Sequence, residues 1–165
     1  MHSWRVAVLP FIEESLLLRS IDLDQPWDSE GNAKLHELVP HGFKCHSRED
    51  GTPFTQLFAV SDRGGFWTGS TPVRSTDIKD PGSHTLVLIE LDLPGVNWMS
   101  PTDISLDELL ELLESHGRLP SPHPAGVQMA FASTAVRCVP HEKITAEYLR
   151  AIVSIDGNED TSGFE

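Results

Sequence analysis

The chain has 165 residues, a length that predicts one domain with a hydrophobic core of its own. Hydrophobic residues make up 39% and charged residues 22%, which argues against a disordered chain. The formal net charge of −13 disfavours nucleic-acid binding and docking to anionic lipid headgroups.

The sequence contains no apolar run of about 18 residues, so it predicts no transmembrane helix and no membrane insertion. The best N-terminal candidate, residues 4–18, is interrupted by Arg5, Pro10, Glu13 and Glu14. A signal peptide with a long apolar core is also absent from the sequence as written, which predicts a cytoplasmic protein unless a further segment precedes it.

The first predicted elements are helical. Apolar positions 4, 8, 11, 12 and 16 have helical spacing, and Pro10 predicts a kink or the restart of a second helix. We expect Trp4, Val8, Phe11 and Ile12 to pack on a sheet. A short helix over residues 30–39 is expected to end before Pro40.

The middle of the chain predicts strands. Residues 43–45 are a candidate short strand, and residues 54–60 are a better one. The continuous apolar run 86–91 predicts a central strand buried on both faces. Between them, the glycine-rich segment 63–69 predicts a surface loop whose Trp67 folds back on the core, because it lacks the lysine and following helix of a phosphate-binding loop.

A capping box at Ser105–Glu108 predicts the start of a helix, and Gly117 predicts its end. The apolar face of this helix is formed by leucines at positions 106, 109, 110 and 113. We therefore expect aspartate at Leu109 or Leu113 to destabilise the domain strongly.

The C-terminal part predicts a hairpin and a last helix. Strands at 126–132 and 136–139 are expected to meet across a turn at Ser133–Thr134, and Thr145 precedes an amphipathic helix over 146–153. Since helices and strands are segregated, we predict an α+β domain over residues 1–156, with an antiparallel sheet of three to five strands and flanking short helices. Residues 157–165 are expected to form a flexible acidic tail.

Two cysteines and two histidines are possible zinc ligands. Cys45-His46 and Cys138 with His141 supply suitable atoms, but their spacing is not that of a zinc motif, so no metal is expected to be needed for folding. Cys45 and Cys138 could form a disulfide or remain two small buried residues, and the sequence leaves both possibilities open.

Other polar groups also have a plain interpretation. A hydrolase could use one of four histidines near acids, yet no Gly-x-Ser-x-Gly motif is present, and these residues are expected to be exposed loop histidines: His84, His116, His123 and His141. A calcium site is conceivable at four carboxylates, although the last two fit helix N-terminal charges better: Glu90, Asp92, Asp103 and Asp107. The four tryptophans are expected in the core or at its edge: Trp4, Trp27, Trp67 and Trp98. The residues alone thus assign no catalytic, cofactor-binding or metal position.

Several segments in order resemble a bacterial prepilin-like family of unknown function, whose C-terminal part carries His, nine residues and then Asp-Gly. The matching segments are His2–Val6 with Leu9–Glu13, Gln25–Ser29 with Asn32 and Leu35, Phe43–Cys45, Asp77–Asp80 with Gly82, Ser83 and Thr85, Gly95–Met99 with Pro101 and Asp103, and His123-Pro124 with Gly126, Phe131 and Ala132. The resemblance covers residues 2 to about 156 and implies the globular head of a type IV pilin or type II secretion pseudopilin.

The chain departs from this family in two places. Ser133-Thr134 replaces Asp-Gly, so a hairpin turn that requires positive φ is expected to be altered or strained. The hydrophobic N-terminal helix of the family, with its prepilin cleavage site and a following cysteine, is expected to be missing, which would leave Cys45 without that partner.

The resemblance implies a non-enzymatic structural or interaction module of a cell-surface protein. We expect protein partners, no nucleic acid, and a monomer or weak oligomer. The alternatives are a small hydrolase or metal-dependent enzyme on a related scaffold, or a shortened gene product without a filament role. A deep pocket lined by histidines and carboxylates would favour the enzyme.

Overall fold

The structure is a computed structural model that describes residues 1–45, 47, 52–69 and 71–157. The chain forms two compact units. We call the first, Met1–Gln56 with Leu93–Thr102, the helical unit, and the second, Leu57–Asp92 with Asp103 onward, the sheet unit. The single domain over residues 1–156 stays a prediction, and the predicted tail lies, apart from Gly157, outside the described residues.

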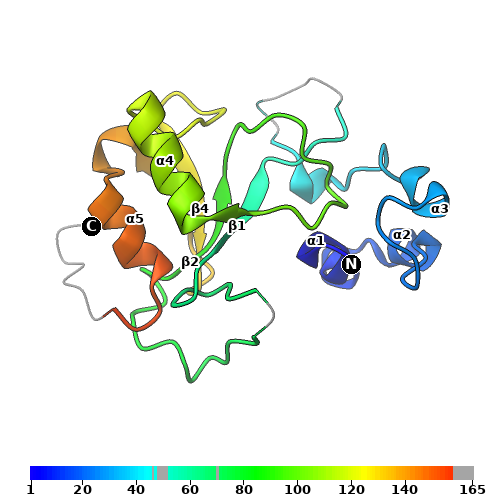
Figure 1. Cartoon of the computed structure of the whole chain (residues 1–165), viewed down its shortest axis with the longest axis horizontal. Helices are drawn as coiled ribbons and strands as arrows, with labels where there is room; N and C mark the ends of the chain where they lie inside the picture. The colour runs from blue at the N-terminus through cyan, green and yellow to red at the C-terminus, as the bar shows by residue number, and fades with distance from the viewer. Residues whose placement is uncertain (46, 48–51, 70, 158–165) are drawn as a thin grey trace. The chain divides into compact units, whose positions relative to one another are not determined.

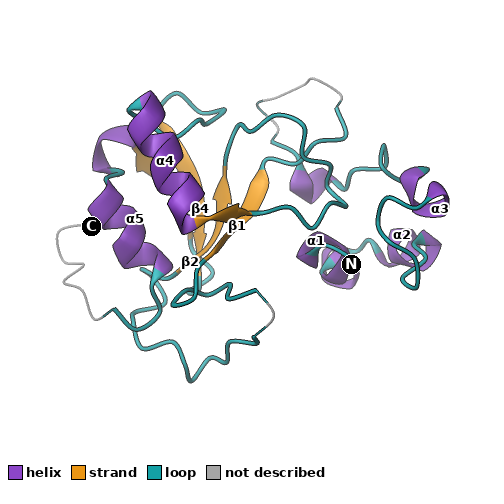
Figure 2. Cartoon of the chain, in the orientation of Figure 1, coloured by secondary structure: helices purple, strands orange, loops and turns teal. Residues whose placement is uncertain are grey.

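The sheet unit contains a five-stranded sheet in the order β3-β1-β2-β4-β5 (Figures 1 and 2). Its strands are β1 Leu57–Ser61, β2 Leu86–Glu90, β3 Ile104–Ser105, β4 Gly126–Phe131 and β5 Val136–Pro140. The α+β prediction is confirmed, and β2 is central as expected. The sheet is mixed rather than wholly antiparallel, because the two-residue β3 runs parallel to β1. The Asp103 carboxylate, which accepts the Ala59 N–H at 2.9 Å, helps to hold β3 there.

Two helices of the sheet unit, α4 Leu106–His116 and α5 Ala146–Val153, pack on each other and lie on one face of the sheet (Figure 1). The predicted capping box is present: the Glu108 carboxylate accepts the Ser105 N–H at 2.8 Å, and the Ser105 hydroxyl accepts the Glu108 N–H at 3.2 Å. The pKa of Glu108 lies below its usual value because its carboxylate accepts hydrogen bonds from the Ser105 hydroxyl, at 2.7 Å, and from the Ser105 N–H. Gly117 ends α4 with φ 69°, a left-handed conformation that glycine adopts readily.

The apolar faces of both helices enter the core, although to different depths. Leu109 of α4 and Leu149 and Ile152 of α5 are 0% exposed. Leu113 is half-buried. No helix among the described residues is long and apolar enough to cross a bilayer.

The β4–β5 hairpin is constrained at both ends. A Cβ on Gly126 would collide with the Val139 carbonyl, so this position requires glycine. At the turn, Thr134 has φ 69°, a conformation that β-branched residues rarely adopt, so the expected strain is present. Two hydrogen bonds hold the turn: the Ser133 N–H donates to the Gly82 carbonyl and the Thr134 N–H to the Phe131 carbonyl, both at 2.9 Å.

The helical unit consists of short helices. They are α1 Trp4–Ala7, η1 Leu9–Ile12, α2 Ser15–Ser20, α3 Glu30–Ala33 and η2 His41–Phe43. The predicted restart at Pro10 is confirmed, since Pro10 lies in the first turn of η1. The strand predicted over residues 43–45 is wrong, because Phe43 ends a 3-10 turn. The helix predicted over residues 30–39 is shorter, with hydrogen-bonded turns replacing its second half.

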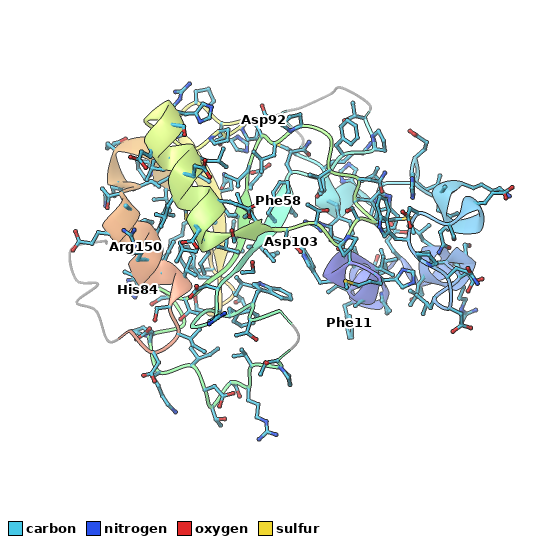
Figure 3. The ribbon with its side chains drawn as sticks, viewed as in Figure 1. Phe11, Phe58, His84, Asp92, Asp103 and Arg150 are labelled. Carbon is cyan, nitrogen blue, oxygen red and sulfur yellow. The ribbon has the colours of Figure 1, made fainter. Side chains whose placement is uncertain are left out.

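The buried face of the first helices differs from the predicted one. Phe11 is 85% exposed and extends away from the ribbon (Figure 3), and Ile12 is 38% exposed, so neither packs on a sheet. The buried residues are instead Arg5, Val6 and Leu9. The prediction failed because Glu13, with φ 65°, and the 3-10 geometry of η1 break the helical period on which it relied.

Arg5 is the unexpected core residue of the helical unit, with an exposed fraction of 0%. Its guanidinium donates to the Ser3 hydroxyl at 3.0 Å and to the Ser100 carbonyl at 3.4 Å, and it lies 4.8 Å from the Trp4 ring centroid. Hydrogen bonding and the aromatic face compensate the cost of burying this charge. Nearby, Trp98 is 0% exposed and stacks on Phe43.

Leu109→Asp is expected to lower the free energy of unfolding by at least about 4 kcal/mol, because it places an unpaired carboxylate in a fully buried site. Leu113→Asp is expected to cost less, since Leu113 is half-buried. Chemical denaturation of both variants, with the exposed change Glu111→Asp as control, measures this. Leu109→Asp and the control unfolding at the same denaturant concentration would contradict the packing of α4.

Thr134→Gly is expected to raise the free energy of unfolding by about 1 kcal/mol, because glycine relieves the strain of positive φ. Thr134→Ala is the matched control, since it retains a Cβ and therefore the strain. Thermal melts of the two variants check the prediction, which fails if the alanine variant is stabilised as much as the glycine variant.

Candidate functional site

The residues weighed as zinc ligands are not assembled as the sequence hypothesis required. Cys45 is buried in the helical unit, whereas Cys138 is exposed on β5, and neither forms a disulfide. His141 lies in the turn η3 His141–Lys143, and His46 lies outside the described residues. No group of three metal-ligating side chains in the described part of the chain includes Cys138 or His141.

The four carboxylates of the possible calcium site do not form one group of ligands in the described part of the chain. Asp103 supports β1, as described above, and Asp107 lies in the first turn of α4, where a negative charge favours the helix dipole. Within the described residues, no group of three potential ligands contains Asp92, Asp103 or Asp107. The simpler interpretation of Asp107 therefore holds.

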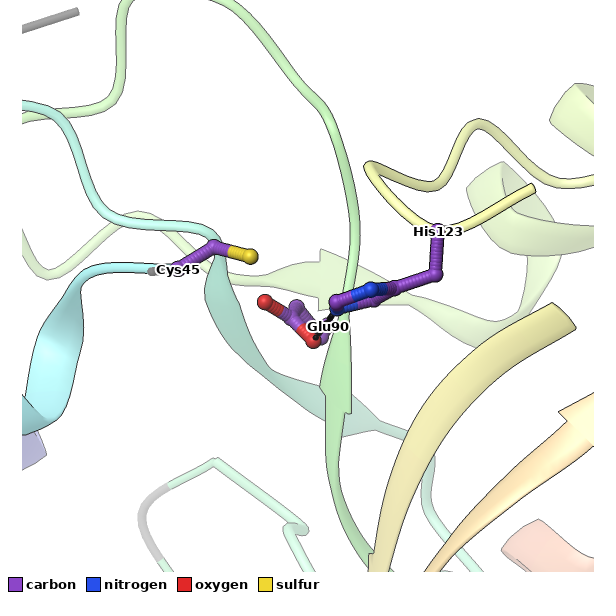
Figure 4. A group of neighbouring side chains, drawn as sticks. All are labelled: Cys45, Glu90 and His123. Carbon is purple, nitrogen blue, oxygen red and sulfur yellow. Dashed lines mark hydrogen bonds and ion pairs between the residues drawn. The ribbon is translucent and has the colours of Figure 1, made fainter. Parts of the chain in front are cut away.

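Glu90 takes part in a histidine–carboxylate pair of the sheet unit. Its carboxylate lies 3.0 Å from Nε2 of His123, and a dashed line marks this contact in Figure 4. Glu90 is the last residue of β2 and is 8% exposed, while His123 comes from the loop before β4. The Ser121 hydroxyl holds that loop, because it accepts the His123 N–H at 3.1 Å and donates to the Gly126 carbonyl at 2.7 Å. His123, expected to be an exposed loop histidine, thus comes from a loop but is half-buried and paired with a carboxylate.

A cavity of about 410 Å³ lies elsewhere in the sheet unit, and we call it the basic pocket. It is lined by residues of four segments: Ser83, His84, Arg137, Cys138, Val139, Pro140, Lys143 and Tyr148. Its volume is in the range of pockets that bind small organic groups.

Several local structures position these side chains. The Thr145 hydroxyl caps α5 by accepting the Tyr148 N–H at 3.0 Å, which orients the first turn that carries Tyr148. The Arg137 guanidinium lies 5.3 Å from the centroid of the Phe131 ring, a cation–π contact across the hairpin. Ser83 and His84 come from the loop that enters β2, where the His84 N–H donates to the Pro81 carbonyl.

The charged residues in the described lining of the basic pocket are Arg137 and Lys143, and His84 adds a titratable imidazole. No carboxylate belongs to this lining, although the chain has 25 acidic residues. The pocket is therefore a local site of positive charge on an acidic protein, and such a site favours anions.

Two polar groups in the lining have distinctive surroundings. Nδ1 of His84 lies 3.2 Å from the Ser83 hydroxyl, whereas its Nε2 is buried and has no hydrogen-bond partner among the described residues. Burial raises the pKa of Tyr148, while the nearby Arg137 charge acts in the opposite direction. Its phenol therefore stays protonated and can donate a hydrogen bond.

Some residues of the basic pocket are candidates in the sequence, but the sequence does not indicate that they lie together. The sequence offers His84 as a possible hydrolase histidine and Cys138 as a possible zinc ligand or disulfide partner. The expectation that Cys138 is buried is wrong. No sequence motif marks Arg137, Lys143 or Tyr148 as a functional residue. The available signal was the spacing of Arg137 and Cys138 on a strand followed by Lys143, but nothing local places the loop at residue 84 beside them.

Residues 1–60 of the chain match the model of a family described as "Protein of unknown function (DUF1559)". This family is associated with prepilin-like proteins. No curated protein and no solved structure matches significantly. The match covers the start of the chain and assigns no role to the basic pocket.

The free energy of unfolding is expected to fall as pH rises above about 10, because Tyr148 ionises in the unfolded chain at that pH but only at higher pH when folded. The proton is thus held more tightly by the folded state, and the stability that it contributes is present below pH 10 and lost above. Tyrosinate absorbance of the chain's single tyrosine measures the folded pKa directly.

Tyr148→Phe is the control for this titration, because it removes the ionising group and should reduce the loss of stability at alkaline pH. A folded-state midpoint at or below that of free tyrosine would contradict the burial of the phenol.

Proposed function

We propose that this chain is a non-enzymatic interaction module that resembles the globular head of a prepilin-like cell-surface protein. The observation that carries the proposal is the basic pocket, whose described lining combines positive charge with apolar walls and contains no carboxylate. Such a lining is suited to holding a group of a partner. The described lining contains no carboxylate that could orient the His84 imidazole as a catalytic base.

The family match supports the structural half of the proposal. Residues 1–60 include the segments that carry the resemblance near the N-terminus, among them His2–Val6, Gln25–Ser29 and Phe43–Cys45. Arg5 and Asn32, which belong to the resembling residues in this region, are buried polar residues with hydrogen-bond partners. The resemblance in this region therefore concerns residues that maintain the fold, as expected for a module without catalysis.

A small hydrolase is the second candidate, because Ser83 and His84 are in contact within a cavity. In a serine hydrolase the histidine is oriented by a carboxylate on its second nitrogen. Here Nε2 of His84 has no partner among the described residues, and the Glu90–His123 pair does not line this cavity. These contacts favour binding over hydrolysis.

Site-specific photo-crosslinking in the native cell tests the proposal. A benzophenone amino acid placed at Val136, which is 68% exposed and adjoins Arg137, is expected to form one discrete adduct with a protein, identified by mass spectrometry in cell-envelope and cytosolic fractions. The same amino acid at the exposed Glu111, outside the pocket lining, is the matched control and should not form that adduct.

The enzymatic alternative is measured on the purified chain with activated ester and phosphoester substrates. Turnover that is lost in Ser83→Ala and His84→Gln but retained in His116→Gln would overturn the proposal. An identical adduct from Val136 and Glu111 would also count against a defined contact surface.

A further inference from the structure

We propose that the basic pocket binds the carboxylate of an aspartate or glutamate side chain in an acidic segment of a protein partner. This inference rests on the proposed function and adds the chemistry by which the partner is recognised. It runs against the chain's net charge of −13, which by itself predicts repulsion of acidic partners.

The two charged groups of the lining and the His84 imidazole approach the cavity from different segments. Arg137 comes from β5, Lys143 from η3 and His84 from the loop that enters β2. Exposed carboxylates occur in the same part of the chain, at Glu142 and Glu147, but neither belongs to the described lining. A carboxylate that enters the cavity would therefore meet donors of positive charge on several sides.

The remaining lining residues determine what kind of carboxylate fits. Val139, Pro140 and the Tyr148 ring supply an apolar wall that suits the methylene groups of a side chain, and the Ser83 hydroxyl supplies a neutral polar group. The guanidinium of Arg137 has the planar pair of donors that matches a carboxylate. A volume of about 410 Å³ accommodates a glutamate side chain with room for the adjoining backbone.

The position of the pocket favours a polypeptide as the source of the carboxylate. β5 is an edge strand of the sheet, and three consecutive residues, Val136, Arg137 and Cys138, are exposed on it. An extended segment that pairs with an edge strand presents its alternate side chains to the flanking pockets. One acidic side chain of such a segment would reach the basic pocket.

The probe for the test is a capped hexaglutamate peptide, followed by amide chemical shifts of the ¹⁵N-labelled full chain. We expect shift changes centred on His84, Cys138 and Lys143, and about a ten-fold weaker affinity for the double variant Arg137→Gln/Lys143→Gln, since both charge-assisted contacts to the ligand carboxylate are lost. Capped hexaglutamine should produce no such shifts.

The matched control is Arg118→Gln/Arg150→Gln, which removes the same charge from two exposed arginines outside the pocket lining. It should bind hexaglutamate as the parent does. Equal weakening of both double variants would overturn the proposal, because it would show a nonspecific response to net charge. Thermal melts of both variants establish that they are folded.

Acetate and inorganic phosphate are tested as further ligands in the same chemical-shift experiment. Shifts at the same residues by acetate, at higher concentration than the peptide, support a carboxylate site that a polypeptide occupies better. Binding of phosphate without binding of hexaglutamate would overturn the assignment. An adduct at Val136 with no response to hexaglutamate would retain the interaction role and refute the ligand class, so the two proposals fail separately.

Discussion

The sheet unit depends on the double pairing of β2. This strand is hydrogen-bonded to β1 on one side and to β4 on the other, and Leu86 and Ile89 are buried at 3% and 0% exposure. Pairing on both edges thus satisfies much of its backbone while its side chains contribute to the core, an arrangement that stabilises a central strand in water. Displacing it would separate β1 from the β4–β5 hairpin.

The two ends of β2 carry the polar groups that distinguish this unit. At its start, Ser83 and His84 contribute to the basic pocket, and at its end Glu90 meets His123. Because the strand is fixed on both edges, these groups are held by the sheet rather than by flexible loops alone. One central strand can therefore hold polar groups at both of its ends.

Charge is distributed unevenly on this protein, and the unevenness matters more than the total. With 12 basic against 25 acidic residues, the average surface is negative. The walls of the basic pocket nevertheless carry Arg137 and Lys143, with His84 beside them. A local field within a Debye length of roughly 8–10 Å decides binding at a site, whereas net charge governs solubility and long-range encounter.

Buried polar residues organise the helical unit in place of long helices. Asn32, which is 1% exposed, accepts the Asp22 N–H and donates to the carbonyls of Asp22 and Pro26, each at 2.9 Å. Arg5 plays a comparable role through its bonds to Ser3 and Ser100. These side chains satisfy backbone groups of irregular segments that no helix or sheet ladder could satisfy.

Elements whose signals are local could be predicted from the sequence. The capping box at Ser105, the cap at Thr145, the break at Pro10 and the strained turn at Thr134 all depend on residues within one turn of each other, and all are present. The apolar run of β2 likewise indicated a central strand, which is confirmed, although Val87 and Leu88 are half-buried rather than buried.

Which side chains meet across long separations could not be predicted from local patterns. The parallel pairing of β3, the burial of Arg5 in place of Phe11, and the convergence of His84 with Arg137 and Tyr148 join residues that no periodicity relates. Local patterns report which face of an element is apolar, but they carry no information on which distant segment will cover it. The candidate site was therefore visible in the sequence as separate residues, and packing alone made it a pocket.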